Sequence, residues 1–306
     1  MRLVTFERGG STRLGALRGD LVIDLVQRGS ETGLALPTTM LALIEAGAEG
    51  LAAARRVLDA APDQPGDGVY PLAEVRLLAP IPEPRRNVIC LGRNYAEHAR
   101  ESSAARGQEA PPPAHPVYFT KATTTVIGPF DPIPYDAAIS TQIDWEVELG
   151  VVIGRRGRGI PVERALEWVF GYMVINDVTA RDLQSRHQQW FLGKSLDGSC
   201  PTGPCIVTAD ELPDPHALRL RLRVNGVTKQ EATTADLIFN VNACIATLAR
   251  GTTLLPGDII ATGTPAGVGF ARTPPEFLKP GDLVEAEIEG IGTLRNPVVE
   301  ARGQER

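Results

Sequence analysis

Cysteine is scarce in this sequence of 306 residues, which has only four, and none of them forms a Cys-x-x-Cys pair. The histidines are also few, and they do not form a cluster. Without such spacings, structural zinc and a disulfide framework are not expected. We therefore predict free thiols at Cys90, Cys200, Cys205 and Cys244.

Long apolar runs are absent as well, since no stretch approaches the roughly 20 residues that a membrane helix needs. The first ten residues contain three charged side chains and no apolar segment typical of a signal peptide, so secretion is not expected. Excess positive charge is lacking too, because the net charge is -6 and the pI is near 5.4. We therefore expect a cytoplasmic protein with no membrane partner and no nucleic-acid partner.

The hydrophobic content of 43% is enough for one large domain, or for one large and one small domain. The 31 glycines and 25 prolines favour many strands and turns. Short strands are predicted at 3–6, 14–17 and 21–25, and helices at 39–45 and 50–60. A run of three prolines at 80–84 then resembles a linker. We predict a small N-terminal domain over residues 1–78 and a larger domain over residues 79–306.

Residues 142–153 alternate between apolar and acidic side chains, which is the pattern of a β-strand. One face has the apolar residues Trp145, Val147, Leu149 and Val151, and the other has Asp144, Glu146 and Glu148. Three neighbouring carboxylates repel one another and are costly to bury alone, whereas Mg²⁺ or Mn²⁺ prefers such oxygen ligands. From this stretch alone, a metal site and an edge strand with a solvated acidic face are equally good interpretations.

A helical segment at 93–101 brings His98 and Glu101, three residues apart, onto one helix face. A carboxylate beside an imidazole can orient it as a general base, although by spacing alone an ordinary surface pair is the commoner case. The polar, proline-rich segment 102–116 follows, and such a helix with its loop could be a mobile lid.

Three further residues stand at strand ends or on a predicted helix. Lys121 ends the strand predicted at 117–121 and is a candidate for binding an anionic substrate, although a surface lysine is commoner. Asp177 follows the strand predicted at 171–175, where either a site ligand or a helix N-cap fits. Gln184 lies about two helical turns further along.

Two glycine motifs resemble nucleotide-binding sequences. The Gly-Lys-Ser at 193–195 lacks the first glycine of a phosphate-binding loop, because Gln188 stands there. The glycine-rich segment 262–269 fits a dinucleotide fingerprint, but too little chain follows it for a nucleotide-binding sheet. Its backbone N–H groups could instead meet a substrate carboxylate, and a plain tight turn is the alternative.

These motifs occur together, and in the same order, in one known family. The matching stretches are LGRNYAEHARE (91–101), VYFTKATT (117–124), DWEVELGVVIG (144–154), GYMVINDVTARDLQ (171–184), WFLGKSLDGSCPTGP (190–204) and PGDIIATGTPAGVG (256–269). On these stretches the chain resembles the fumarylacetoacetate hydrolase superfamily. The resemblance implies a β-rich α+β fold, with a mixed β-roll core of strongly bent sheets after the small N-terminal domain, in a homodimer.

The resemblance also implies roles for individual residues. The metal, Mg²⁺ or Mn²⁺, would be bound by Glu146, Glu148 and Asp177. The catalytic residues would be His98 with Glu101, as a lid pair that orients or activates a water, and Lys194. Residues near the substrate would be Lys121, Gln184 and Thr264, the last in a loop that faces the substrate carboxylate.

A 2-oxo acid can bind such a metal through its keto and carboxylate oxygens, so that the metal stabilises the enolate formed on it. The resemblance thus implies a hydrolase that cleaves C–C bonds of acylpyruvate-type 2,4-dioxo acids or related 2-oxo acids, with a role in aromatic catabolism. The alternative is an isomerase or decarboxylase of unsaturated 2-oxo diacids or oxaloacetate at the same metal site. A non-catalytic metabolite-binding protein with this fold is a third possibility.

Overall fold

The largest sheet runs through the whole molecule and contains twelve strands in the part of the chain that is described. The computed structural model describes residues 1–105, 107, 111 and 113–301. In spatial order the main path of the sheet is β4 (Val69–Pro71), β3 (Leu21–Asp24), β2 (Ser11–Arg18), β1 (Arg2–Arg8), β14 (Cys200–Thr208), β12 (Val169–Asn176), β11 (Val147–Ile153), β17 (Ile259–Ala261), β6 (Val88–Gly92) and β7 (Val117–Lys121). Two short strands join it from the side, β5 (Arg76–Leu77) on β1 and β8 (Val126–Ile127) on β14.

A second sheet of five strands packs against the first. Its order is β16 (Val227–Thr233), β15 (Arg219–Val224), β18 (Leu283–Ile288), β19 (Gly292–Glu300) and β9 (Ile133–Tyr135). In β18 buried and half-buried residues alternate, which is the pattern of a strand with one face toward solvent. A separate pair consists of β10 (Ile143–Asp144) and β13 (Thr179–Ala180).

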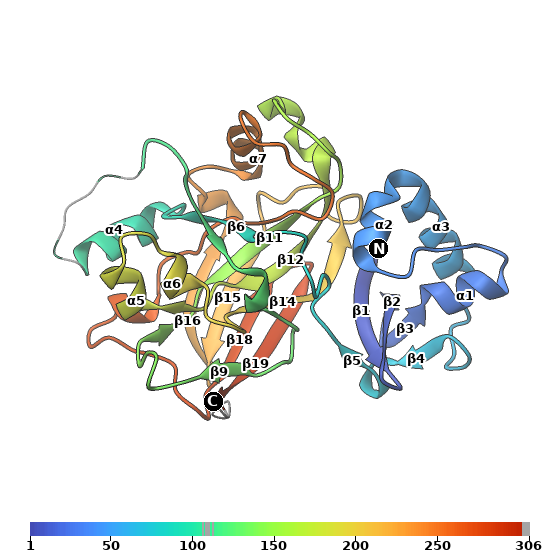
Figure 1. The fold of residues 1–306 in the computed structure, drawn as a ribbon, viewed down its shortest axis with the longest axis horizontal. Helices are drawn as coiled ribbons and strands as arrows, with labels where there is room; N and C mark the ends of the chain where they lie inside the picture. The colour runs from blue at the N-terminus through green and yellow to red at the C-terminus, as the bar shows by residue number, and fades with distance from the viewer. Residues whose placement is uncertain (106, 108–110, 112, 302–306) are drawn as a thin grey trace.

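The helices lie in two groups at opposite ends of the molecule (Figure 1). Beside the N-terminal strands are α1 (Leu25–Glu31), α2 (Met40–Glu45) and α3 (Gly47–Ala60). At the other end are α4 (Ala96–Ala104), α5 (Arg181–Arg186) and α6 (Phe191–Lys194), and α7 (Val241–Ala249) lies above the sheet in this view. Short 3₁₀ segments occur at Leu72–Glu74, Thr123–Thr125, Val162–Trp168, Thr234–Asp236 and Gly269–Ala271.

Most predicted elements are present with changed ends. The strand predicted at 21–25 stops at Asp24, whose side chain accepts from the Gln27 N–H at 2.9 Å and so caps α1, a helix that the sequence analysis missed. The helix predicted at 39–45 begins at Met40, because Thr39 is its N-cap. The β-rich α+β fold itself is confirmed.

The acidic strand is interrupted. Its pairing ends at Asp144 and resumes at Val147, so that the predicted single strand is two, β10 and β11. The predicted alternation is nevertheless correct, since Val147, Leu149 and Val151 belong to the core between the two sheets whereas Val152 packs on the opposite side. The edge-strand alternative is wrong, because β11 pairs with β12 on one side and with β17 on the other.

The N-terminal strands continue the main sheet. Strand β1 pairs antiparallel with β14, with Leu3 opposite Ile206. Both residues are fully buried in the core on that side of the sheet. The division of the chain into two domains at residue 78 stays a prediction. Strands from both sides of that position pair within one sheet.

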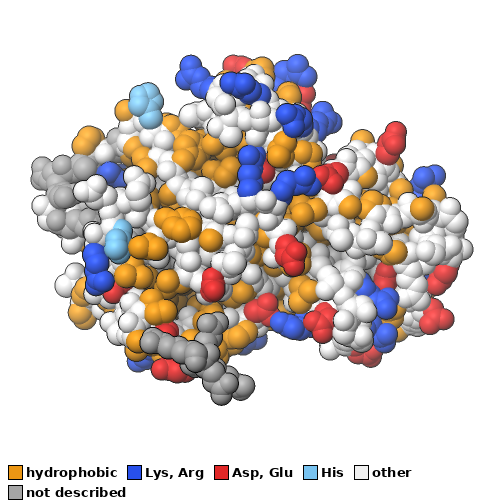
Figure 2. Space-filling model, in the orientation of Figure 1, with side chains coloured by type: hydrophobic (Ala, Val, Ile, Leu, Met, Phe, Trp, Pro, Cys, Tyr) orange, Lys and Arg blue, Asp and Glu red, His pale blue; other side chains and the backbone are white. Residues whose placement is uncertain are grey.

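The cysteines, the surface charges and the apolar character of the helices can be compared with the predictions from the sequence. The four cysteines are free thiols, as predicted, and all are buried. On the face in Figure 2, charged and hydrophobic side chains are interspersed, and Lys and Arg gather along its upper part. None of the described helices has the length and apolar character needed to cross a membrane.

Candidate metal and proton-transfer site

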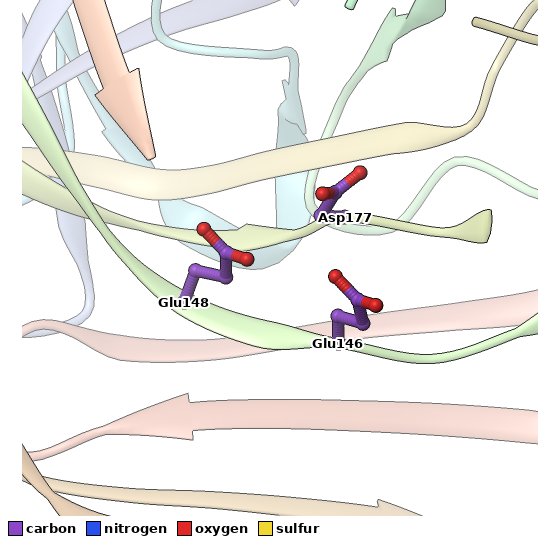
Figure 3. Close-up of side chains that lie close together, drawn as sticks. All are labelled: Glu146, Glu148 and Asp177. Carbon is purple, nitrogen blue, oxygen red and sulfur yellow. The ribbon is translucent and has the colours of Figure 1, made fainter. Parts of the chain in front are cut away.

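The three predicted metal ligands come together where β11 and β12 run side by side. Glu148 lies in β11, Glu146 immediately precedes it, and Asp177 immediately follows β12. Antiparallel pairing places Val147 opposite Asn176, and the Asp177 N–H donates to the Glu146 carbonyl at 2.9 Å. One oxygen from each carboxylate lies within 4.8 Å of the others, and all three side chains are buried (Figure 3).

The interruption of the acidic strand is stabilised by side chains from elsewhere in the chain. The Glu146 N–H donates to Asn176 Oδ1 at 3.0 Å, and the Val147 N–H donates to Gln230 Oε1 at 3.0 Å. These bonds replace ladder bonds that the backbone would otherwise lose, and buried N–H groups need such partners. The backbone between β10 and β11 is therefore held by these side chains as well as by the bond from the Asp177 N–H to the Glu146 carbonyl.

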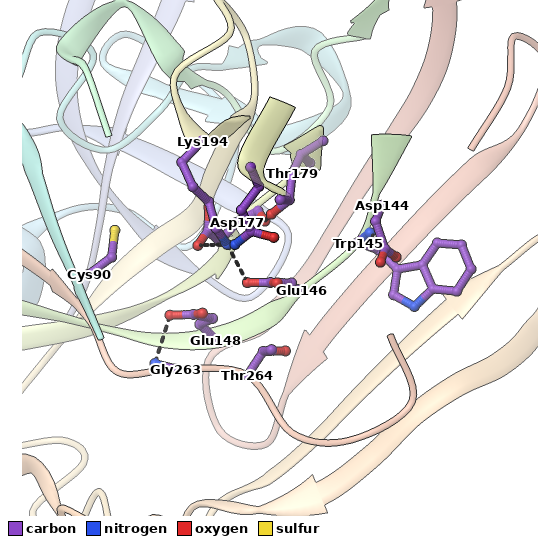
Figure 4. A network of polar contacts seen from close by, with 12 residues as sticks. Cys90, Asp144, Trp145, Glu146, Glu148, Asp177, Thr179, Lys194, Gly263 and Thr264 are labelled. Atoms are coloured by element: carbon purple, nitrogen blue, oxygen red, sulfur yellow. Dashed lines mark hydrogen bonds and ion pairs between the residues drawn. The ribbon is translucent and has the colours of Figure 1, made fainter. Parts of the chain in front are cut away.

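Lys194 lies between two of the carboxylates (Figure 4). Its Nζ is 2.7 Å from Glu146 Oε2 and 2.6 Å from Asp177 Oδ2, and the side chain is 2% exposed. The short helix α6 ends at Lys194 and brings the ammonium group to the triad. Sequence reasoning placed this lysine at the site only through the family resemblance.

Lys121 has a different place from the one predicted. Its Nζ lies 2.8 Å from Asp177 Oδ1 and donates to the Val178 carbonyl at 3.1 Å and to Ser199 Oγ at 3.2 Å. It also donates to the Lys194 carbonyl. The surface-lysine alternative is wrong, because the side chain is fully buried. Lys121 supports Asp177 and the end of α6 from behind and does not line the site cavity, so direct substrate binding by it stays a prediction without support from its contacts.

Arg181 lies in the motif at 171–184, where no role was predicted for it, and it lines the site cavity. Its Nε donates to Asp144 Oδ2 at 2.8 Å, and Nη1 donates to Gln184 Oε1 at 3.1 Å. Its Nη2 lies 2.7 Å from Glu146 Oε1. The N-cap alternative for Asp177 is also wrong, because α5 has Ala180 at its N-cap position. The one feature of the sequence that could have pointed to Arg181 is its place four residues after Asp177.

The charges of the site shift the pKa values of its carboxyl groups in opposite directions. Burial would raise the pKa of Glu146, but the positive charges of Lys194 and Arg181 outweigh it and hold the value at about 2. Burial raises the pKa of Glu148 well above its usual range, and the negative charges of Asp177 and Glu146 add to the effect. Burial would lower the pKa of Lys194, but Asp177 and Glu146 raise it overall, so its amine stays charged.

The predicted pair of His98 and Glu101 is formed on α4. His98 Nδ1 is 3.0 Å from Glu101 Oε1, and Ser102 Oγ lies 3.4 Å from His98 Nε2. The Gly267 N–H donates to both carboxylate oxygens of Glu101 at 3.0 Å each. The surface-pair alternative is wrong for the histidine, which is only 7% exposed.

The glycine-rich segment 262–269 donates to carboxylates of the chain itself. Besides the bond from Gly267, the Gly263 N–H donates to Glu148 Oε2 and the Gly269 N–H donates to Asp144 Oδ1, each at 2.7 Å. These three N–H groups are thus occupied, and their use for a substrate carboxylate finds no support in the contacts. Thr264 Oγ1 donates to the Val147 carbonyl at 3.0 Å and accepts from Gln230 Nε2 at 2.8 Å.

A small cavity of about 30 Å³ brings most of these residues together. Seven of its lining residues were predicted or implied as site residues, or lie beside them: His98, Ser102, Glu146, Glu148, Gln184, Lys194 and Thr264. Others were not assigned, and they include Arg93, Phe119, Arg181, Trp190 and Phe270. The aromatic residues that line the cavity form no periodic pattern in the sequence, because they come from separate loops and elements.

The carboxylate triad fits a divalent cation by its chemistry. Its donors are hard oxygens, three ligands are available, and they are out of contact with bulk water. Among the described residues, no Lys or Arg nitrogen lies within ion-pair distance of Glu148, although its two carboxylate neighbours repel its charge. A cation held by Glu146, Glu148 and Asp177 would remove that repulsion.

Comparison with known proteins gives a consistent result. Residues 87–299 match the family model described as fumarylacetoacetate (FAA) hydrolase C-terminal. The chain is 44% identical over 304 residues to oxaloacetate tautomerase YisK of Bacillus subtilis, covering 97% of this chain and 100% of that protein.

Solved structures agree with the fold. Fumarylacetoacetate hydrolase from the psychrophilic Exiguobacterium antarcticum matches with a TM-score of 0.82 and 42% identity, over 98% of this chain and 100% of that one. Maleylpyruvate hydrolase from Sphingobium sp. SYK-6, solved in complex with manganese(II) and pyruvate, matches with a TM-score of 0.77 and 32% identity, over 99% of this chain and 100% of that one.

Proposed function

The chain belongs to the fumarylacetoacetate hydrolase family, and on this premise we propose that it is a metal-dependent enzyme that interconverts the enol and keto forms of oxaloacetate. The observation that carries the proposal is the 44% identity, over the full length of the relative, to a protein named oxaloacetate tautomerase. This supports the alternative of an isomerase acting on oxaloacetate better than the expected C–C hydrolase of acylpyruvates. Decarboxylation and a role in aromatic catabolism stay predictions.

The metal would be held by Glu146, Glu148 and Asp177, and we propose Mg²⁺ or Mn²⁺, since a structural relative contains manganese(II). When bound, a divalent ion supplies Lewis-acid polarisation of a 2-oxo group. Among the described residues, the ion pairs at this position join three cations, Lys121, Arg181 and Lys194, to Asp144 and the triad, which have four negative charges when all are ionised. They leave one net negative charge, which a divalent cation turns positive, and a doubly anionic substrate then becomes favourable.

The proton transfers fall to the lid pair. Glu101 Oε1 faces His98 Nδ1, which leaves His98 Nε2 as the nitrogen that can exchange a proton with the substrate. Tautomerisation needs one proton taken from the enol oxygen and one delivered to the carbon beside the keto group, and a single imidazole can serve both. Lys194 remains charged in this setting and would hold the substrate's developing negative charge.

Three assays on one preparation test the proposal. Enol oxaloacetate is mixed with Mg²⁺-loaded protein, and the loss of enol absorbance is followed against the uncatalysed rate. Pyruvate formation is measured in the same sample, and cleavage of an acylpyruvate in a parallel one. We expect fast loss of the enol, little pyruvate and little cleavage, with the activity removed by chelation. Rapid acylpyruvate cleavage with no effect on the enol would instead support the hydrolase.

We also propose that the enzyme works as a homodimer in the cytoplasm, and the family resemblance supports the dimer. Light scattering on the purified chain tests the first statement, and fractionation of the source cells tests the second. A monomer that is fully active would contradict the dimer.

A further inference from the structure

Three cationic side chains line the site cavity, and only one of them lacks an anionic partner among the described residues. Arg181 lies against Asp144 and Glu146, and Lys194 lies between Glu146 and Asp177. Arg93 lines the same cavity with no described carboxylate within ion-pair distance. Its hydrogen bonds go to neutral oxygens, from Nη2 to Ser103 Oγ at 3.2 Å and to the Pro111 carbonyl at 3.5 Å.

The guanidinium of Arg93 is only partly satisfied. Its Nε is buried and has no hydrogen-bond partner. A buried donor without a partner costs free energy, and more so when it carries charge. A planar guanidinium with free donors is the group best suited to bind a carboxylate through two parallel hydrogen bonds.

The backbone of Arg93 gives an independent sign of function. Its φ is 57°, in the left-handed region that L residues rarely adopt. The other described non-glycine residue with positive φ is Asn225, which lies with Gly226 in the tight turn between β15 and β16, where this conformation is ordinary. Arg93 is in no hairpin turn, since it follows β6 and precedes α4. Such strain is concentrated at functional sites.

We propose that Arg93 determines substrate specificity by binding the distal carboxylate of a 2-oxo dicarboxylic acid. The proposal rests on the proposed function, because it assumes that the 2-oxo acid end of the substrate lies at the carboxylate triad. Oxaloacetate has a second carboxylate at its other end, whereas pyruvate has none. Arg181 is paired with Asp144 and Glu146, and Lys194 lies at the carboxylate triad with the 2-oxo end, so Arg93 is left to receive that second charge.

The test compares two stable ligands that differ by that carboxylate. L-Malate and L-lactate carry the same 2-hydroxy acid end, and malate has a carboxylate where lactate has a hydrogen. Calorimetry on the Mg²⁺-loaded protein gives the Kd of each for the wild type, Arg93→Met, Arg93→Lys and the control Arg100→Met. Arg100 lies on α4, the helix that follows Arg93, is exposed and does not line the cavity.

We expect the wild type to prefer malate and Arg93→Met to lose that preference by on the order of 10- to 100-fold in the ratio of the two Kd values. Arg93→Lys should keep part of it, and Arg100→Met should keep all of it. An unchanged ratio in Arg93→Met, or a wild type that binds both ligands equally, overturns the inference.

The same variants give a catalytic readout that separates this inference from the proposed function. Proton exchange at C3 is followed by NMR in D₂O for oxaloacetate and for pyruvate, and we expect Arg93→Met to lower the ratio of their kcat/KM values mainly through the KM of oxaloacetate. If the wild type prefers malate through Arg93 but does not act on oxaloacetate, the proposed reaction fails and the specificity assignment stands.

Discussion

Lys194 and Arg181 both lie against Glu146, and this leaves Glu148 as the carboxylate of the triad without a cation beside it. The pKa of Glu148 is accordingly raised by burial and by its two carboxylate neighbours. Its protonated form is thus favoured in the metal-free fold, and binding of a cation requires its ionised form. A neutral side chain of the same shape at position 148 should therefore weaken metal binding without destabilising the metal-free fold.

Glu148→Gln should weaken Mg²⁺ binding by on the order of 100-fold or more, because Mg²⁺ depends on anionic oxygens. The free energy of unfolding of the metal-free protein should not fall, since the amide is neutral, like the protonated carboxyl that it replaces, and can still accept from the Gly263 N–H. Calorimetric titration with Mg²⁺ and urea unfolding in a chelator measure the two effects. Full Mg²⁺ affinity in the variant would contradict the metal assignment.

His98→Ala should lower kcat for enol loss by about 10²- to 10⁴-fold, the usual contribution of general acid–base catalysis. Glu101→Gln should also lower it, because it removes the charge opposite His98 Nδ1. Glu97→Gln is the matched control, as it makes the same change on the exposed side of α4. Steady-state kinetics at saturating metal measure all three, and a fully active His98→Ala would refute the role of the lid pair.

At the scale of elements, the glycine-rich segment 262–269 connects the predicted lid pair to the predicted metal ligands. It meets Glu101 through Gly267 and Glu148 through Gly263. Gly267 has a φ of 103°, and a Cβ there would lie 2.1 Å from the Lys229 carbonyl oxygen. Glycine is required at this position for both reasons.

Gly267→Ala should therefore shift the segment and release Glu101. We expect kcat/KM to fall on the order of 10²-fold, as for other small misplacements in active sites. The free energy of unfolding should fall by at least the roughly 1–3 kcal/mol that a strained backbone conformation costs. Gly281→Ala is the control, since its φ is 95° but no atom lies within 4 Å of the added Cβ. It should lose some stability and keep full activity, and equal activity in both variants would contradict a role for the segment.

The elements show what sequence reasoning can reach. The alternation in β11 and the spacing of His98 and Glu101 are local patterns, and both correctly placed side chains on one face. The break before Val147 is not local, because it depends on Gln230 from the other sheet. Arg181 and Arg93 were not predicted as site residues for the same reason, since their surroundings consist of groups that are distant in the sequence.

At the scale of the whole molecule, the pairing of β1 with β14 makes residues 1–78 part of one continuous sheet. A chain consisting of residues 79–306 would expose the edge of β14 and the buried Ile206, and exposed strand edges promote aggregation. We expect that truncated chain to elute as aggregates on size exclusion, and co-expression of residues 1–78 to restore soluble enzyme. A monodisperse, active truncated chain would show that the two parts are independent.

Because the cysteine thiols are buried, the free energy of unfolding should depend on pH in the alkaline range. Burial raises the pKa of Cys200 and Cys244 to about 12 and of Cys205 to about 11, from a reference value of 9.0. The thiols ionise more readily when unfolded, so the unfolded state binds fewer protons above about pH 9 and stability should fall from there upward. At pH 8 a thiol reagent should label no cysteine in the folded protein and four after denaturation. Labelling before unfolding would contradict the buried placement.

The small site cavity has a consequence for the kinetics of ligand binding. Its space of about 30 Å³ is smaller than a four-carbon acid, and His98 and Ser102 of α4 line it. We therefore expect binding to require a prior movement of α4, whose rate does not depend on ligand concentration. In a rapid-mixing experiment, the observed rate of association should level off as ligand is added, and the plateau is the opening rate itself.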